Sequence, residues 1–140
     1  MAVNTSAGGI ATDPQSVEEV TRTVEDYFLG WYDGDPERMR RALHPDLAKR
    51  SYLSRADGPP LLRAVTATLM IGWTEEGEGR ETDPAKRRLE IVVDEIHGAI
   101  ATARVDSELY REYVHLARTP DGWRIVNTLW TWTDPDHRDA

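Results

Sequence analysis

Glu112 is the residue of this chain best suited to chemistry, because the pattern around it predicts that it is buried. In the C-terminal half, apolar side chains alternate with other types, and Glu112 and Asn127 fall within the apolar set. A buried carboxylate costs several kcal/mol unless it is paired, neutral or hydrated. Glu112 could therefore be a general base or a hydrogen-bond acceptor for a ligand. It could equally be a structural carboxylate paired with an arginine or with Tyr27.

His44 is a second candidate for proton transfer. A proline follows it, so we expect His44 to lie where a short helix ends. Histidine side chains can exchange protons near neutral pH, and His44 could act as a proton shuttle at the mouth of a pocket. It could also cap the helix by bonding the last carbonyl groups. Both interpretations are open.

Aromatic side chains could form the wall of a binding site. One set is expected near the N-terminal helices, where it could contact a flat, largely apolar ligand or simply belong to the core: Tyr27, Trp31, Tyr52 and Trp73. Asn127 would add a hydrogen-bonding group to this ligand-binding set. A second set is expected on the outer face of the C-terminal strands, where aromatic residues predict an interface between subunits: Tyr113, His115, Trp130 and Trp132.

Several kinds of site are excluded or disfavoured. The chain has no cysteine, which excludes disulfides, thiolate metal ligands and a cysteine nucleophile. The histidines show no metal-ligand spacing, and no phosphate-binding glycine loop or dinucleotide fingerprint occurs. We therefore expect neither a metal site nor a cofactor. The glutamates of one polar segment are interpreted as part of a solvated loop: Glu75, Glu76, Glu78 and Glu81.

Three helices are expected to position the N-terminal candidates. A proline follows Asp13, which is typical of a helix start, and apolar residues then recur every three to four positions up to Trp31. Gly34 can end this helix, and the proline after Asp35 begins a short second one. A third helix is expected after the turn at residues 57–60. Its inward face would consist of Leu62, Val65, Thr66, Leu69 and Trp73.

From residue 86 the apolar period changes from 3.6 to 2, which predicts strands. Four strands are expected at residues 88–96, 99–106, 110–118 and 123–133, and a further short one at residues 49–53. Short turns join the four, so they form an antiparallel meander, and no connection is long enough for a parallel pair.

The turns also predict the register of this meander. In the first hairpin Val92 faces Ala103, and in the last hairpin Val114 faces Asn127. The inner face, which receives the helices, would then carry Val92, Ile96, Ala101, Ala103, Val105, Val114, Leu116, Ile125 and Leu129.

Length and composition fit one globular domain, since the chain has 140 residues, of which 39% are hydrophobic and 30% charged. We expect this domain at residues 13–133, between a disordered leader at residues 1–12 and a polar tail at residues 134–140. The net charge of -8 would repel nucleic acid and anionic membranes, so neither is expected as a partner. Without a signal peptide or a membrane span, the chain is predicted to be cytoplasmic.

Three helices followed by an antiparallel meander resemble the nuclear-transport-factor-2-like superfamily, which includes SnoaL-like and ketosteroid-isomerase-like cones. WYDGDPERM (residues 31–39) is similar to the junction between its first two helices, and LHPD (residues 43–46) to the step that follows. YREYVHL (residues 110–116) and DGWRIVN (residues 121–127) resemble the closing hairpin of its lumazine-binding branch.

The resemblance implies an α+β fold in which three N-terminal helices cover a cone-shaped, curved antiparallel sheet. It also implies a pocket at the open end of the cone and a homodimer formed through the outer face of the sheet. It implies no particular chemistry, since the superfamily holds isomerases, dehydratases, cyclases and non-catalytic binding modules.

Three hypotheses for the function follow. The first is a homodimeric cone that binds a small, largely apolar or aromatic molecule. The second is an isomerase, cyclase or dehydratase that uses Glu112 as base and Tyr27 or His44 as proton donor. The third is a non-catalytic, dimerising interaction module whose pocket is closed by its own side chains. The sequence alone leaves all three open.

Overall fold

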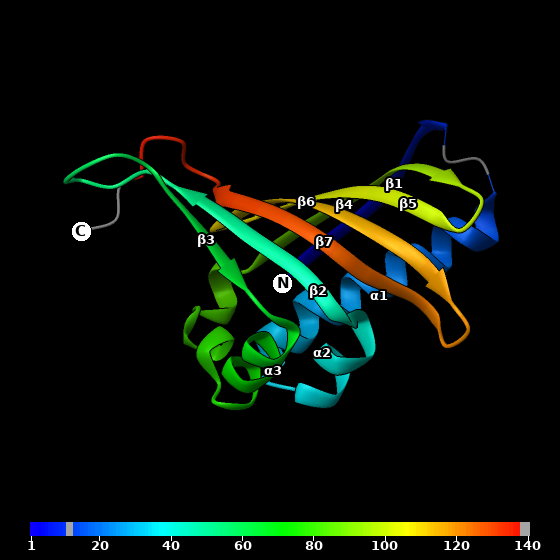
Figure 1. Cartoon of the computed structure of the whole chain (residues 1–140), viewed down its shortest axis with the longest axis horizontal. Coiled ribbons are helices and arrows are strands. Elements are labelled where there is room, and N and C mark those ends of the chain that lie inside the picture. Colours follow the sequence, from blue (N-terminus) through cyan, green and yellow to red (C-terminus); the bar gives the residue numbers. More distant parts are fainter. Residues whose placement is uncertain (11–12, 138–140) are drawn as a thin grey trace.

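The computed structural model describes residues 1–10 and 13–137 and has an α+β fold in which helices cover one side of a curved sheet (Figure 1). The helices are α1 (Pro14–Asp33), α2 (Pro36–Ala42) and α3 (Ala67–Glu75). The strands are β1 (Ala2–Ile10), β2 (Leu43–Leu53), β3 (Leu61–Val65), β4 (Arg88–His97), β5 (Ile100–Ser107), β6 (Tyr110–Thr119) and β7 (Gly122–Trp132). Two short 3-10 helices, η1 (Glu78–Glu81) and η2 (Pro84–Lys86), lead from α3 to β4.

The described strands form a single sheet in the order β1-β4-β5-β6-β7-β2-β3. The predicted fold class is confirmed, and β4 to β7 form the predicted antiparallel meander. The prediction that no parallel pair exists is wrong, because β1 pairs with β4 and β2 pairs with β7 in parallel. In each case helices or several strands lie between the partners along the chain, and these supply the length that a parallel connection requires.

The N-terminal segment is a strand and not the predicted disordered leader. β1 follows β4 from the pair Ala2 and Arg88 onward and so forms one edge of the sheet. Its small side chains are mostly exposed, so backbone hydrogen bonds hold it in place, and these leave no apolar pattern in the sequence. Residues 11–12 of the predicted leader, and residues 138–140 of the predicted tail, lie outside the described residues. The rest of the tail contains a turn in which the His137 amide donates to the Asp134 carbonyl, at 3.1 Å.

The first helix begins and ends at the predicted residues, and the second begins at Pro36 as predicted but ends at Ala42, because Leu43 and His44 already belong to β2. Gly34 adopts the left-handed conformation, with φ of 65°, that lets the chain leave α1. The Asp35 carboxylate then accepts a hydrogen bond from the Arg38 amide, at 3.1 Å, and caps α2.

The third helix begins later than predicted. Residues 61–65 form the edge strand β3, and α3 starts only after Thr66, whose hydroxyl accepts from the Leu69 amide at 3.2 Å. The apolar residues Leu61 and Leu62 misled the helical interpretation, since both remain exposed on β3.

The core lies between the helices and the concave face of the sheet. Val24 and Phe28 of α1 pack there against fully buried residues such as Ile91, Val114 and Ile125. Burying a side chain of this size contributes roughly 1.5–3 kcal/mol, so this layer fixes how α1 sits on the sheet.

A bulge in β7 changes which of its side chains face the core. Leu116 pairs with Ile125, but the preceding residue His115 pairs with Asn127, so Val126 has no partner. One extra residue moves every later side chain of the strand to the opposite face. The predicted pairing of Val114 with Asn127 is therefore wrong, and Thr128 stands opposite Val114 instead.

A similar irregularity occurs in β4, between Val93 and Glu95. The hairpin also turns at residues 98–99, one residue later than predicted, with His97 opposite Ile100. Together the two features place Val93 opposite Ala103, in the position that the prediction gave to Val92. Val93 is fully buried as a result.

Candidate functional site

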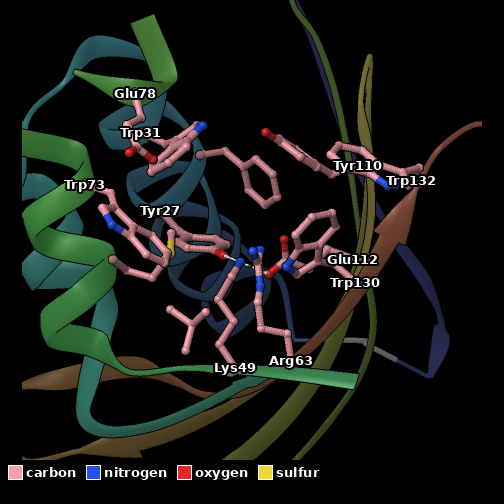
Figure 2. A pocket seen from close by; sticks show the side chains of 13 residues that line it. Tyr27, Trp31, Lys49, Arg63, Trp73, Glu78, Tyr110, Glu112, Trp130 and Trp132 are labelled. Carbon is pink, nitrogen blue, oxygen red and sulfur yellow. Dashed lines mark hydrogen bonds and ion pairs between the residues drawn. The ribbon is translucent and has the colours of Figure 1, made fainter. Parts of the chain in front are cut away.

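A cavity of about 190 Å³ lies between α1, α3 and the inner face of the sheet (Figure 2). Its floor consists of buried residues: Tyr27, Phe28, Lys49, Val65, Met70, Glu112 and Trp130. Its rim consists of partly or fully exposed residues: Trp31, Arg63, Trp73, Glu78, Tyr110 and Trp132. The cavity is thus closed at its base and reachable from solvent at its rim.

Three polar side chains meet at the base of the cavity. Lys49 and Glu112 are 7% and 2% exposed, and the Lys49 Nζ lies 3.2 Å from the Glu112 Oε2. The Tyr27 hydroxyl donates to the same carboxylate oxygen, at 2.8 Å, and accepts a hydrogen bond from Lys49. Each of the three side chains therefore makes a polar contact with the other two. Hydrogen bonds of this kind are needed to offset the cost of burying an ion pair.

The protonation of this triad follows from its burial. Burial raises the pKa of Tyr27 well above its ordinary value, and the nearby Glu112 carboxylate raises it further, so the phenol keeps its proton at neutral pH. Burial lowers the pKa of Lys49, while the Glu112 carboxylate acts in the opposite direction. The carboxylate is thus the group that favours a charged Lys49 in this environment.

Aromatic rings from β6 and β7 form one wall of the cavity. Tyr110 lies edge-on to Trp130, with ring centres 5.0 Å apart, and stacks on Trp132 at 5.8 Å. The Lys49 ammonium lies 5.6 Å from the centre of the Trp130 ring, where a cation–π attraction adds to the ion pair. Burial, followed by the nearby carboxylates, raises the pKa of Tyr110 to about 12, so this wall is uncharged at neutral pH.

Strand register brings the wall and the floor together. Tyr110 pairs with Trp132, and Glu112 pairs with Trp130, so all four side chains point to the same face. The bulge at Val126 is the cause, since without it the two tryptophans would point outward.

Gly79 lets η1 approach α1 closely enough to complete the rim. A Cβ atom at this position would lie 2.1 Å from the Trp31 carbonyl oxygen, which no side chain could tolerate. The adjacent Glu78 reaches the rim beside Trp31 (Figure 2). The segment interpreted as a solvated loop therefore contains a close contact between helices.

Four of the residues predicted for catalysis or ligand binding line the cavity, namely Tyr27, Trp31, Trp73 and Glu112. The pairing of Glu112 with Tyr27, one of the alternatives considered, occurs in the structure. Sequence reasoning missed the partner Lys49. Lys49 is on the buried face of β2 with residues 47, 51 and 53, but only the leucines at 47 and 53 are apolar, so the sequence shows no clear alternation there.

Other predicted site residues lie elsewhere. Tyr52 is 53% exposed because it points away from the cavity on β2, and Asn127 is exposed on the outer face after the β7 bulge. His44 does not line the cavity and does not cap α2. Its Nδ1 instead accepts a hydrogen bond from the Asp46 amide, at 3.0 Å.

The predicted outer-face set divides into two groups. Tyr113 and His115 are exposed on the outer face, as predicted. Trp130 is only 8% exposed and, like Trp132, lines the cavity, so the predicted place of these two on the outer face is wrong. The bulge again explains the difference.

Within the described part of the chain, no three His, Asp or Glu side chains are grouped closely enough to hold a metal ion. None of the described helices has both the length and the apolar character needed to cross a membrane.

The family described as "Putative lumazine-binding" matches residues 15–131 of the chain. The chain belongs to this family. Comparison with curated proteins finds no match. The resemblance to the lumazine-binding branch, stated from the sequence, is confirmed.

Solved structures support the same fold for this family member. A nuclear-transport-factor-2-like protein of unknown function from Methylobacillus flagellatus KT is 19% identical, with a TM-score of 0.68, and the match covers 89% of this chain and 98% of that one. A similar protein from Silicibacter pomeroyi DSS-3 is also 19% identical, with a TM-score of 0.67 and coverage of 84% and 96%. A cystatin-like fold protein from Burkholderia xenovorans LB400 is 22% identical, with a TM-score of 0.61 and coverage of 86% and 93%. At these identities the likeness establishes the fold alone.

Proposed function

We propose that this protein binds a small, largely aromatic molecule in the cavity between α1, α3 and the sheet. The observation that carries the proposal is the composition of the cavity. Aromatic rings form its walls, and the hydrogen-bonded triad of Tyr27, Lys49 and Glu112 forms its base. Pockets for small molecules combine an apolar lining with a few fixed polar groups in this way.

The volume of the cavity limits the size of the ligand. An engineered cavity of roughly 150 Å³ in another protein holds benzene, so a space of about 190 Å³ fits one or two fused rings. The space also counts against the interaction-module hypothesis, which requires a pocket filled by its own side chains.

Calorimetric titration with 2-naphthol, a neutral two-ring probe, tests the proposal. We expect saturable binding that Tyr110→Ala weakens by roughly tenfold, because this ring belongs to the wall. Tyr113→Ala is the matched control, since Tyr113 is on the same strand but on the outer face. No binding to the unmodified protein, or equal loss in both variants when both are folded by circular dichroism, would contradict the proposal.

A second candidate is proton transfer on a bound carbonyl compound. The observation that favours it is the chain of hydrogen bonds from Lys49 through the Tyr27 hydroxyl to Glu112, which places an acid and a base at one cavity. In deuterium oxide, the protein should then accelerate exchange of the α-protons of 2-tetralone, and Glu112→Gln should abolish the acceleration. Exchange at the uncatalysed rate would leave binding as the function.

We also propose that two copies associate through the outer face of the sheet and that the protein is cytoplasmic. Support for association comes from Tyr113 and Leu129, which pair across β6 and β7 and are 52% and 45% exposed. An exposed apolar pair of this kind, next to His115, is typical of contact surfaces.

A further inference from the structure

Arg63 is one of two charged residues of the cavity, with Glu78, that have no charged partner among the described residues. It is on the edge strand β3 directly opposite Ser51, which is on the inner face of β2, so its side chain points into the cavity from the open edge. Among residues 1–10 and 13–137, no hydrogen bond or ion pair to Arg63 is present, although the same residues contain ten ion pairs made by other side chains.

The charges around Arg63 leave an excess of positive charge at this end of the cavity. Lys49 and Arg63 enter from neighbouring strands on the same side, and Glu112 already accepts hydrogen bonds from Lys49 and Tyr27 (Figure 2). Glu78 is at the opposite end of the cavity, beside Trp31. Burial is the main cause of the lowered pKa of Lys49, and repulsion from Arg63 acts in the same direction.

We propose that the ligand of this cavity is an aromatic carboxylate whose anionic group binds Arg63. This inference rests on the proposed function and adds the chemical class of the ligand. The guanidinium group offers paired donors that match the two oxygens of a carboxylate, whereas Glu112 repels an anion from the deeper base. The rings of the ligand then lie along the wall of Tyr110, Trp130 and Trp132, with the carboxylate at the β3 edge.

Calorimetric titration with 2-naphthoate and its neutral counterpart 2-naphthamide, near neutral pH, tests this assignment. The unmodified protein should bind the carboxylate roughly tenfold or more tightly than the amide, the effect of one charge-assisted hydrogen bond. Since the net charge of -8 repels anions overall, such a preference must arise locally. Arg63→Gln should remove the preference, because it should weaken binding of 2-naphthoate about tenfold more than binding of 2-naphthamide.

Arg50→Gln is the matched control. Arg50 is on the neighbouring strand β2 but is exposed on the opposite face, so this variant makes the same change in net charge away from the cavity. It should keep the preference for the carboxylate.

The possible outcomes separate the inference from the proposed function. Equal affinity of the unmodified protein for the two probes overturns the carboxylate assignment while the binding function stands. Equal weakening of both probes by Arg63→Gln overturns it as well, because Arg63 would then act through packing. If neither probe binds the unmodified protein, the proposed function and the inference both fail.

Discussion

Removing only one charge from the buried Lys49–Glu112 pair should destabilise the protein more than removing the whole polar triad. Glu112→Gln keeps an acceptor for the Tyr27 hydroxyl but leaves the Lys49 ammonium without a counter-charge. In the triple variant Tyr27→Phe, Lys49→Met, Glu112→Leu, no polar group remains at the base of the cavity. The comparison therefore separates the cost of an unpaired charge from the value of the pair.

The size of the expected changes in the free energy of unfolding follows from the geometry of the pair. The charged atoms are 3.2 Å apart, and the two side chains are only 8% and 3% exposed. With an effective dielectric constant of about 20, their attraction is roughly 5 kcal/mol, and the cost of removing both charges from water offsets most of it. Breaking such a pair costs about 3–5 kcal/mol, whereas replacing it with apolar groups of similar volume is often neutral or stabilising. We therefore expect a loss of about 3–5 kcal/mol in the free energy of unfolding for Glu112→Gln and no loss for the triple variant.

Urea unfolding followed by far-ultraviolet circular dichroism measures both free energies of unfolding. The exposed pair of Glu18 and Arg22 is the control, and replacing both by Gln should cost less than about 1 kcal/mol. In Glu112→Gln, the folded pKa of Lys49 falls further below that of the unfolded chain. The unfolded state then binds more protons, so this variant should gain stability as pH rises toward the ordinary pKa of lysine. A cost below about 1 kcal/mol for Glu112→Gln at neutral pH would refute the reasoning.

Three further predictions concern other parts of the fold. Gly79→Ala should lower the free energy of unfolding by about 1–3 kcal/mol, because the new Cβ meets the Trp31 carbonyl. Gly72→Ala should raise it by about 0.5–1 kcal/mol, because this position in α3 has open space for a Cβ. Thermal unfolding of both variants shows whether each change has the expected sign. Asp26→Asn should cost about 1–3 kcal/mol at neutral pH. Burial acts to raise the pKa of Asp26, but hydrogen bonds from two arginines of α2 hold it below 3.8. The difference in free energy of unfolding between Asp26→Asn and the unmodified protein should therefore narrow as pH falls below that value. Acid titrations of stability in which this difference stays constant would contradict the prediction. Tyr113→Glu should halve the mass seen by light scattering, and a mass equal to that of the unmodified protein would exclude the outer face as the interface.

The parts of the fold that depend on local patterns could be predicted from the sequence. The proline after Asp13 and the glycine at position 34 mark the ends of α1, because both act through their own backbone conformations. The burial of Glu112 was also predictable, since β6 alternates regularly from residue 110 to residue 116. Its pairing with Tyr27 was among the alternatives considered.

The parts that depend on distant pairing could not be predicted in the same way. The extra residue at Val126 is visible only when β6 and β7 are paired, and it exchanges the faces of Asn127 and Trp130. The strand β1 depends on backbone bonds to β4, and β3 is defined by its pairing with β2. Lys49 was missed as a site residue because an isolated lysine in a strand gives no sign of the buried carboxylate that pairs with it.

The five tryptophans provide the most direct test of the cavity as a binding site. The fifth, Trp123, is buried elsewhere in the core. The other four line the cavity: Trp31, Trp73, Trp130 and Trp132. In a nitrogen-15 spectrum, titration with 2-naphthol should shift the four indole signals along one saturation curve and leave that of Trp123 in place. Signals that all stay in place, or a shift of Trp123 without the other four, would contradict the proposed binding site.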